Sequence, residues 1–194
     1  MKISPIFYIV GHLLLALGGI MMIPALLDWM LHYSSYKGIM LSSGICLMVG
    51  ALSVLANRPT EQINLTIKET FLMTTLTWVI LSLYSSLPFL LTHLTRTSTD
   101  SFFEAVSALT TTGGTIIPQL SKASPGLLLW RALLQWIGGV GIIVMAMTVL
   151  PILRIGGVQL FRSEFSDRSE KILPRISQVT KAICLIYGAI TLCC

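Results

Sequence analysis

The sequence predicts an all-α membrane protein made of transmembrane helices and one re-entrant helix with its loop. The mean hydropathy is +0.83, and 54% of the 194 residues are hydrophobic while 11% are charged, far below the roughly 25% of a soluble domain. Four runs are apolar enough to cross a bilayer, which takes about 20 mostly apolar residues. Between the last two runs lies a short amphipathic stretch that ends in threonines and glycines.

The predicted spans follow one another with short connections. They cover residues 6–31, 39–56, 70–94 and 126–150. A fifth apolar run begins near Ala182 and reaches only Cys194, so we expect a fragment, or a product cut short inside that helix. The first run follows Lys2 as a secretory signal would, but it is longer than the about 7 to 15 apolar residues of a signal. It is therefore interpreted as a retained helix.

The lysines and arginines predict the orientation, because cytoplasmic loops retain positive charge during insertion. With the N-terminus in the cytoplasm, nine of the 13 basic residues lie inside, and four lie outside: Lys37, Arg96, Lys122 and Arg131. This topology also directs the threonine and glycine loop outward. The net charge of +5 therefore reflects topology and indicates no nucleic-acid partner.

Two acidic residues lie near span ends, Asp28 at the outer end of the first span and Glu69 at the inner start of the third. We expect both in the membrane interface rather than on an ion path. His12, inside the first span, is interpreted as a hydrogen-bonded packing residue, with a proton site as the less favoured alternative.

The stretch between the third and fourth spans has the pattern of a half-length helix. Ser101 and Glu104 have the spacing of a capping box, so a helix is predicted from Ser101 to about Thr110. Such a helix rises about 15 Å, half of the roughly 30 Å hydrocarbon core. Its C-terminal end would lie at mid-membrane, where unsatisfied helix carbonyls favour a cation.

The threonine–glycine segment, residues 110–115, follows this helix and reads TTTGGT. Its threonines offer carbonyls and hydroxyls, and its glycines adopt positive φ without a side-chain clash, which lets successive carbonyls point toward one axis. Rings of such carbonyls replace the hydration shell of potassium. The sequence thus favours a pore helix with a selectivity-filter loop. The alternative is an ordinary external turn after a surface helix.

Two later segments have structural interpretations. Gly138, Gly139 and Gly141 in the fourth span are small residues that let helix backbones pack closely in lipid. Residues 154–181 then mix apolar with charged side chains. This mixture is typical of an amphipathic helix at the inner membrane face or against a partner, and equally of a charged connecting loop.

The sequence shows no residue set for catalysis. It has no intramembrane Ser/His or paired Asp constellation, no His-Glu-x-x-His and no phosphate-binding glycine loop. We therefore expect a protein that is not an enzyme and that takes no cofactor, with potassium as the transported ion.

Ordered motifs occupy the region from about Ser85 to Arg175. They read SLPF at 86–89, SFFEAVS at 101–107, LTTTG at 109–113, LWR at 129–131, QWIGG at 135–139 and QLFRSEFSD at 159–167. In this order they resemble the membrane subunit of the bacterial Trk-type potassium uptake system, in the superfamily that includes the Ktr and HKT transporters. The first two spans resemble the extra N-terminal helix pair of that family.

The resemblance implies one pore built from four consecutive helix, pore-loop, helix repeats. It divides this chain into an N-terminal two-helix pair (1–68), a first repeat (69–153), a cytoplasmic amphipathic connector (154–181) and a truncated start of the second repeat (182–194). It also implies that Gly113 is the filter glycine. The backbone carbonyls of Thr111 and Thr112 are the implied potassium ligands, with Thr110 next, whereas Gly114 stands where the family often has alanine.

The resemblance further implies potassium uptake across the bacterial inner membrane. In the family, two membrane subunits pair and a cytosolic nucleotide-binding regulatory subunit docks beneath them. The alternative at this point is a non-conducting membrane interaction protein or an inactive truncated product. A membrane enzyme is a more distant alternative.

Overall fold

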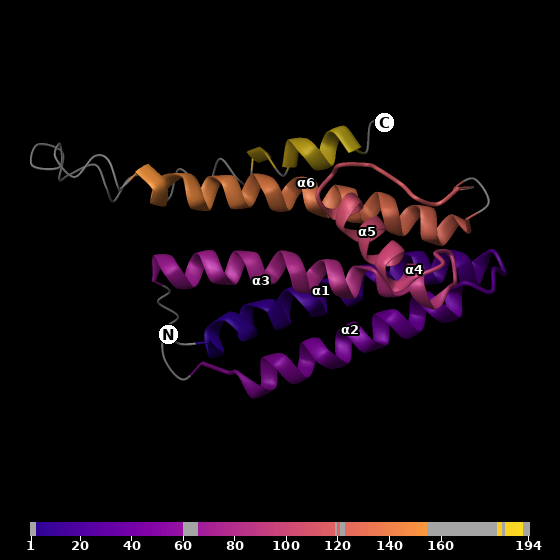
Figure 1. The fold of residues 1–194 in the computed structure, drawn as a ribbon, viewed down its shortest axis with the longest axis horizontal. Helices are drawn as coiled ribbons and strands as arrows, with labels where there is room; N and C mark the ends of the chain where they lie inside the picture. Colours follow the sequence, from indigo (N-terminus) through magenta and orange to yellow (C-terminus); the bar gives the residue numbers. More distant parts are fainter. Residues whose placement is uncertain are drawn as a thin grey trace, which may run out of the picture. The chain divides into compact units, whose positions relative to one another are not determined.

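The computed structural model describes residues 3–59, 66–118, 120, 123–154, 182–183 and 185–191. The chain divides into two compact units, Met1–Gly138 and Gly139–Cys194. The labelled elements of the described part are all helices: α1 (Ser4–Met30), α2 (Tyr36–Ala56), α3 (Ile67–Ser85), α4 (Leu87–Leu91), α5 (Ser98–Leu109) and α6 (Pro125–Arg154) (Figure 1). Residues 185–191 are helical as well. The predicted all-helical fold class is therefore confirmed.

The structure also confirms the membrane character of the chain. In the described residues, four helices are long and apolar enough to span a membrane: Ser4–Met30, Tyr36–Ala56, Lys68–Leu91 and Pro125–Ile143. They overlap the four predicted spans. The division of the chain at residues 68 and 153 stays a prediction, and residues 155–181 of the predicted connector lie outside the described residues.

Helices α1 and α2 lie side by side as an antiparallel pair (Figure 1). Their backbones approach closely at Gly11, where a Cβ atom would lie 3.1 Å from the carbonyl oxygen of Gly50. Ser43 Oγ donates a hydrogen bond across the pair to the Gly18 carbonyl at 2.7 Å. Small residues and one buried interhelical hydrogen bond thus hold the pair together, as in other helix contacts in lipid.

The third predicted span is two helices in the structure. Helix α3 begins with a capping box, because Thr66 Oγ1 accepts from the Glu69 N–H at 3.4 Å and Glu69 Oε2 accepts from the Thr66 N–H at 3.0 Å. It ends at Ser85, and α4 begins at Leu87 with Pro88 in its first turn. Proline has no N–H to donate, which is tolerated at the start of a helix but not in its interior.

Helix α5 begins earlier than the sequence predicted. Its N-cap is Thr97, whose Oγ1 accepts from the Asp100 N–H at 3.1 Å, while Asp100 Oδ2 accepts from the Thr97 N–H at 3.1 Å. The predicted capping box of Ser101 and Glu104 is therefore wrong. Glu104 lies in the second turn of a 12-residue helix, where its carboxylate is free to bind elsewhere.

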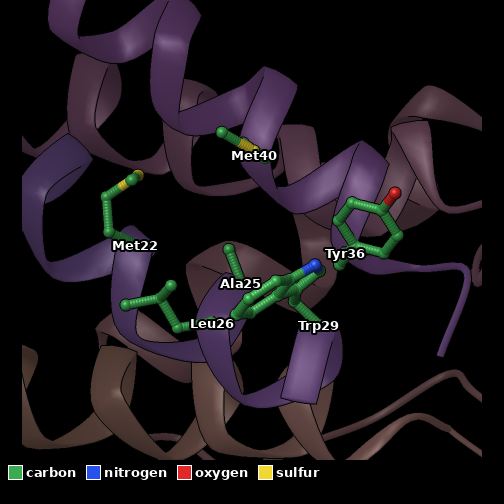
Figure 2. Close-up of a pocket in the computed structure, with 6 residues that line it drawn as sticks. All are labelled: Met22, Ala25, Leu26, Trp29, Tyr36 and Met40. Atoms are coloured by element: carbon green, nitrogen blue, oxygen red, sulfur yellow. The ribbon is translucent and has the colours of Figure 1, made fainter. Parts of the chain in front are cut away.

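Part of the exposed surface of the helix pair is apolar. Figure 2 shows a cavity of about 240 Å³ between α1 and α2, with mostly hydrocarbon side chains around it: Met22, Ala25, Leu26, Trp29, Tyr36 and Met40. Trp29 and Met40 are more than half exposed. Such a surface suits acyl chains and offers no ligand set for an ion.

Candidate functional site

The threonine–glycine segment is held by its N–H groups against the last turn of α5. The N–H of Thr110 donates to the Val106 carbonyl at 2.8 Å, and that of Thr111 donates to the Ala108 carbonyl at 3.0 Å. The next two N–H groups, of Thr112 and Gly113, share the carbonyl of Ser107 at 3.0 and 3.2 Å. All four donors therefore point back toward the helix.

The backbone of this segment is unusual at two positions. Thr111 has φ of +59° and Gly113 has φ of +78°, whereas Thr110, the C-cap of α5, has φ of −82°. Positive φ is free for glycine but exceptional for a β-branched residue, and such strain costs about 1–3 kcal/mol. Such strain persists where the surroundings fix the backbone, and His32 and His93, in the turns after α1 and α4, also have positive φ.

The carbonyl groups of the segment fall into two sets. Within the part of the chain that the structure describes, no hydrogen bond reaches the carbonyl oxygens of Thr110, Thr111 and Thr112, and these residues are exposed. The carbonyl oxygens of Gly113 and Gly114 instead accept from Arg131 Nη2 at 3.0 and 3.2 Å. Three consecutive carbonyls are thus available to an external ligand, and the next two are held by a cation of the chain itself.

Glu104 and Arg131 connect α5, α6 and the segment. The Glu104 side chain is fully buried, and its Oε1 accepts from Arg131 Nε at 2.6 Å. Its Oε2 accepts from Thr115 Oγ1 at 3.0 Å and from the Ile116 N–H at 3.2 Å. Both carboxylate oxygens are therefore satisfied, as a buried charge requires. Glu104 therefore holds the chain at the end of the segment, and Arg131 holds the two glycines that come just before.

Helix α6 lies directly against the end of α5. A Cβ atom at Gly138 would overlap the carbonyl of Leu109, the last residue of α5. Further toward its start, α6 is tied to α3 by the buried Trp130, whose Nε1 donates to the Ser85 carbonyl at 3.1 Å. The interpretation of Gly138 as a packing glycine therefore agrees with the structure. Only glycine lets the two backbones come this close.

The predicted site residues Thr110, Thr111, Thr112 and Gly113 lie together at the end of α5. Sequence reasoning placed Arg131 simply among the outer basic residues and missed its contacts with the segment. A signal was present, because Arg131 is an ionisable residue inside an apolar span, and such residues mark functional sites by default.

The comparisons with known proteins point to one family. The family described as "TrkH: Cation transport protein" matches residues 35–194. The chain is 40% identical over 191 residues to the Trk system potassium uptake protein TrkI of Halomonas elongata, covering 97% of this chain and 38% of that protein. It is 38% identical to the Trk system potassium uptake protein TrkH of Vibrio parahaemolyticus, covering 100% of this chain and 40% of that protein.

A solved structure is also similar. The crystal structure of the potassium transporter TrkH from Vibrio parahaemolyticus matches with a TM-score of 0.83 and 35% identity, over 100% of this chain and 38% of that chain. The chain thus spans about 40% of the length of the relatives that it matches.

Proposed function

The chain belongs to the TrkH family of cation transport proteins, and from this premise we propose that it takes part in potassium uptake across the bacterial inner membrane. It contributes the first of four pore loops, in which α5 is the re-entrant pore helix and residues 110–115 form the filter loop. One observation carries the proposal. Among the residues that the structure describes, the segment ties its N–H groups to α5 and leaves the carbonyls of Thr110, Thr111 and Thr112 without a partner.

These carbonyls suit a dehydrated potassium ion. A ring of carbonyl oxygens replaces the water shell of potassium, and the protein must hold those oxygens in place beforehand. The N–H groups do so on one side, and the Glu104 and Arg131 pair does so on the other. Gly113 also belongs to the proposed ligand set. Its carbonyl oxygen accepts one hydrogen bond from Arg131, and a carbonyl has two lone pairs.

Arg131 raises the question of charge, since a cation near the path would repel potassium. The ion pair with Glu104 answers it, because the carboxylate neutralises the guanidinium at a separation of 2.6 Å. The C-terminal end of α5 adds a partial negative charge. The balance near the segment therefore favours a cation.

The wider proposal covers topology and partners. With the N-terminus in the cytoplasm, most basic residues lie inside, as the positive-inside rule requires. The family resemblance supports a homodimer and a cytosolic nucleotide-binding regulatory subunit. We propose no enzymatic activity and no cofactor, with the lipid bilayer and potassium as the other partners.

A second candidate is a non-conducting membrane interaction protein. The described residues hold one candidate filter loop, whereas a ring of carbonyls around an ion needs several.

Growth on limiting potassium tests both candidates, in a bacterial strain that lacks its own potassium uptake systems. The strain expresses either the 194-residue chain or the complete product of the reading frame. Rescue by the complete product alone supports the transporter. If neither form rescues growth although both insert into the membrane, the interaction protein is favoured.

A further inference from the structure

We propose that Asp28, in the N-terminal helix α1, is a positioning residue for the threonine–glycine segment and acts through the first turns of α6. The inference rests on the proposed function and extends it to a helix outside the pore repeat. Asp28 lies in the last turn of α1 and is 0% exposed, and its predicted place in the membrane interface stays a prediction. A buried carboxylate in a membrane helix is costly unless it is paired, so its partners indicate its role.

Both partners of Asp28 belong to the start of α6. Its Oδ2 accepts from Ser124 Oγ at 2.6 Å, and its Oδ1 accepts from the Gly126 N–H at 2.6 Å. Ser124 Oγ in turn accepts from the Leu127 N–H at 3.4 Å. Asp28 thus caps α6 from another helix, where orphan N–H groups and the positive end of the helix dipole favour an anion.

The contact leaves no room for adjustment. A Cβ atom at Gly126 would lie 2.5 Å from Asp28 Cγ and 2.5 Å from the Pro24 carbonyl oxygen. Real Cβ atoms essentially never come within 3.0 Å of such neighbours. The position of α6 along α1 is therefore set by two short charge-assisted hydrogen bonds and by a backbone contact that only glycine permits.

The next turn of α6 carries Arg131, which holds the segment, and Trp130, which ties α6 to the end of α3. Trp130 and Arg131 follow Gly126 by four and five residues, and Arg131 binds Glu104 and the carbonyls of Gly113 and Gly114. A helix transmits a displacement of its first turn to its second, because the backbone hydrogen bonds between the turns keep its geometry rigid. Loss of the Asp28 cap would shift the guanidinium, and the filter carbonyls with it.

The test uses the complete product of the reading frame, with Asp28→Ala, Asp28→Asn and the control Ser43→Ala. The control removes a buried hydrogen bond between α1 and α2 and leaves α6 untouched. Potassium and sodium uptake are measured in cells with equal amounts of each variant in the membrane. We expect Asp28→Ala to lower the ratio of potassium to sodium uptake by about threefold or more, the size of effect that distant coupled residues have. Asp28→Asn should keep most of the wild-type uptake ratio, since an amide oxygen still accepts from the Gly126 N–H.

Each outcome decides the inference. An unchanged uptake ratio in Asp28→Ala overturns it, and so does an equal fall of the ratio in Ser43→Ala, because Asp28 would then act only on the stability of α1. If Asp28→Ala fails to insert, the ratio in Ser124→Ala decides in the same way, because this variant removes one of the two hydrogen bonds of the Asp28 carboxylate and keeps the Gly126 contact. Wild-type protein in the same assay separates this inference from the proposed function, which fails if the wild type takes up no potassium.

Discussion

At the scale of single residues, the segment depends on which backbone groups are occupied. Thr111 and Gly113 adopt positive φ, and the N–H groups around them return to α5. Among the described residues, the carbonyl oxygens of Thr110, Thr111 and Thr112 accept no hydrogen bond. Residue types indicated a loop that offers carbonyls, and the family resemblance implied Thr111 and Thr112 as the ligands, with Thr110 next. The structure adds that the Arg131 side chain donates to the carbonyl of Gly113, so an ion would share the Gly113 oxygen with Arg131.

The two glycines of the segment should respond differently to the same substitution. Gly113→Ala places a side chain at φ of +78°, where an L-residue is strained by about 1–2 kcal/mol, so we expect uptake to fall severalfold. Gly114→Ala meets Ser107 Oγ at 3.4 Å, an ordinary contact, and should keep near wild-type uptake. Potassium uptake of the complete product measures both. Equal uptake by the two variants would contradict the special role of Gly113.

A charged side chain at Gly113 should abolish potassium uptake without lowering the amount of protein in the membrane. The nearest atom to a Cβ at Gly113 is Gln135 Nε2 at 3.8 Å, so space is available and insertion should survive. The carboxylate of Gly113→Asp would enter the proposed ion path. Uptake and membrane yield are measured together, and wild-type uptake by this variant would refute the filter assignment.

The Glu104 and Arg131 pair should behave as one unit. Removing one partner of a buried ion pair leaves an uncompensated charge and costs about 3–5 kcal/mol, so Glu104→Ala should lower the thermal unfolding temperature strongly. The double variant Glu104→Ala with Arg131→Ala should be more stable than the sum of the single effects predicts. Thermal unfolding of the purified complete product measures this coupling. Strictly additive effects would show that the pair does not act as a unit.

At the scale of elements, the position of α6 decides the geometry of the site. Its first turn is capped by Asp28, and its later turns contact Leu109 at Gly138. Sequence patterns located α6 as a span, and they located the helix before the segment within a few residues. They assigned the capping box of α5 wrongly, because the local Ser-x-x-Glu pattern resembles a cap and the true partner of Glu104 lies 27 residues away.

Helix packing at Gly138 can be tested against a glycine with free space. Gly138→Ala should force α6 away from the carbonyl of Leu109, lower the stability of the complete product and reduce uptake. Gly44→Ala serves as the control, since a Cβ there meets nothing within 4 Å and alanine favours a helix by about 1 kcal/mol. Thermal unfolding and uptake are compared for the pair. Similar behaviour of the two variants would contradict the packing role of Gly138.

At the scale of the whole molecule, three connections that the proposed topology places outside meet at one cavity. This cavity of about 440 Å³ is lined by the turn after α1, the end of α4 and the start of α6: Tyr33, Ser34, Ser35, Lys37, Gly38, Leu91, Thr92, His93, Leu94, Ala123, Ser124 and Leu127. Because the three connections meet at one cavity, they lie on the same side of the molecule. The distribution of basic residues predicts the same arrangement.

The orientation itself can be measured by cysteine labelling in a background without the native cysteines. Ser34→Cys, on the exposed turn after α1, should react with a membrane-impermeant thiol reagent added to intact cells. Arg58→Cys, exposed after the end of α2, should react only after the cells are opened. The reverse pattern would place the N-terminus outside and overturn the proposed topology.

By itself, the sequence determined the membrane character, the approximate spans and the segment that carries the candidate ligands. These follow from composition, length and short motifs, which act within a few residues of the chain. The tertiary structure alone decided that Glu104 pairs with Arg131 and that Asp28 contacts Ser124, which is 96 residues away. Such contacts depend on where helices meet. No local pattern encodes a meeting point, because it is set by the packing of whole helix faces and by the need to pair every buried charge.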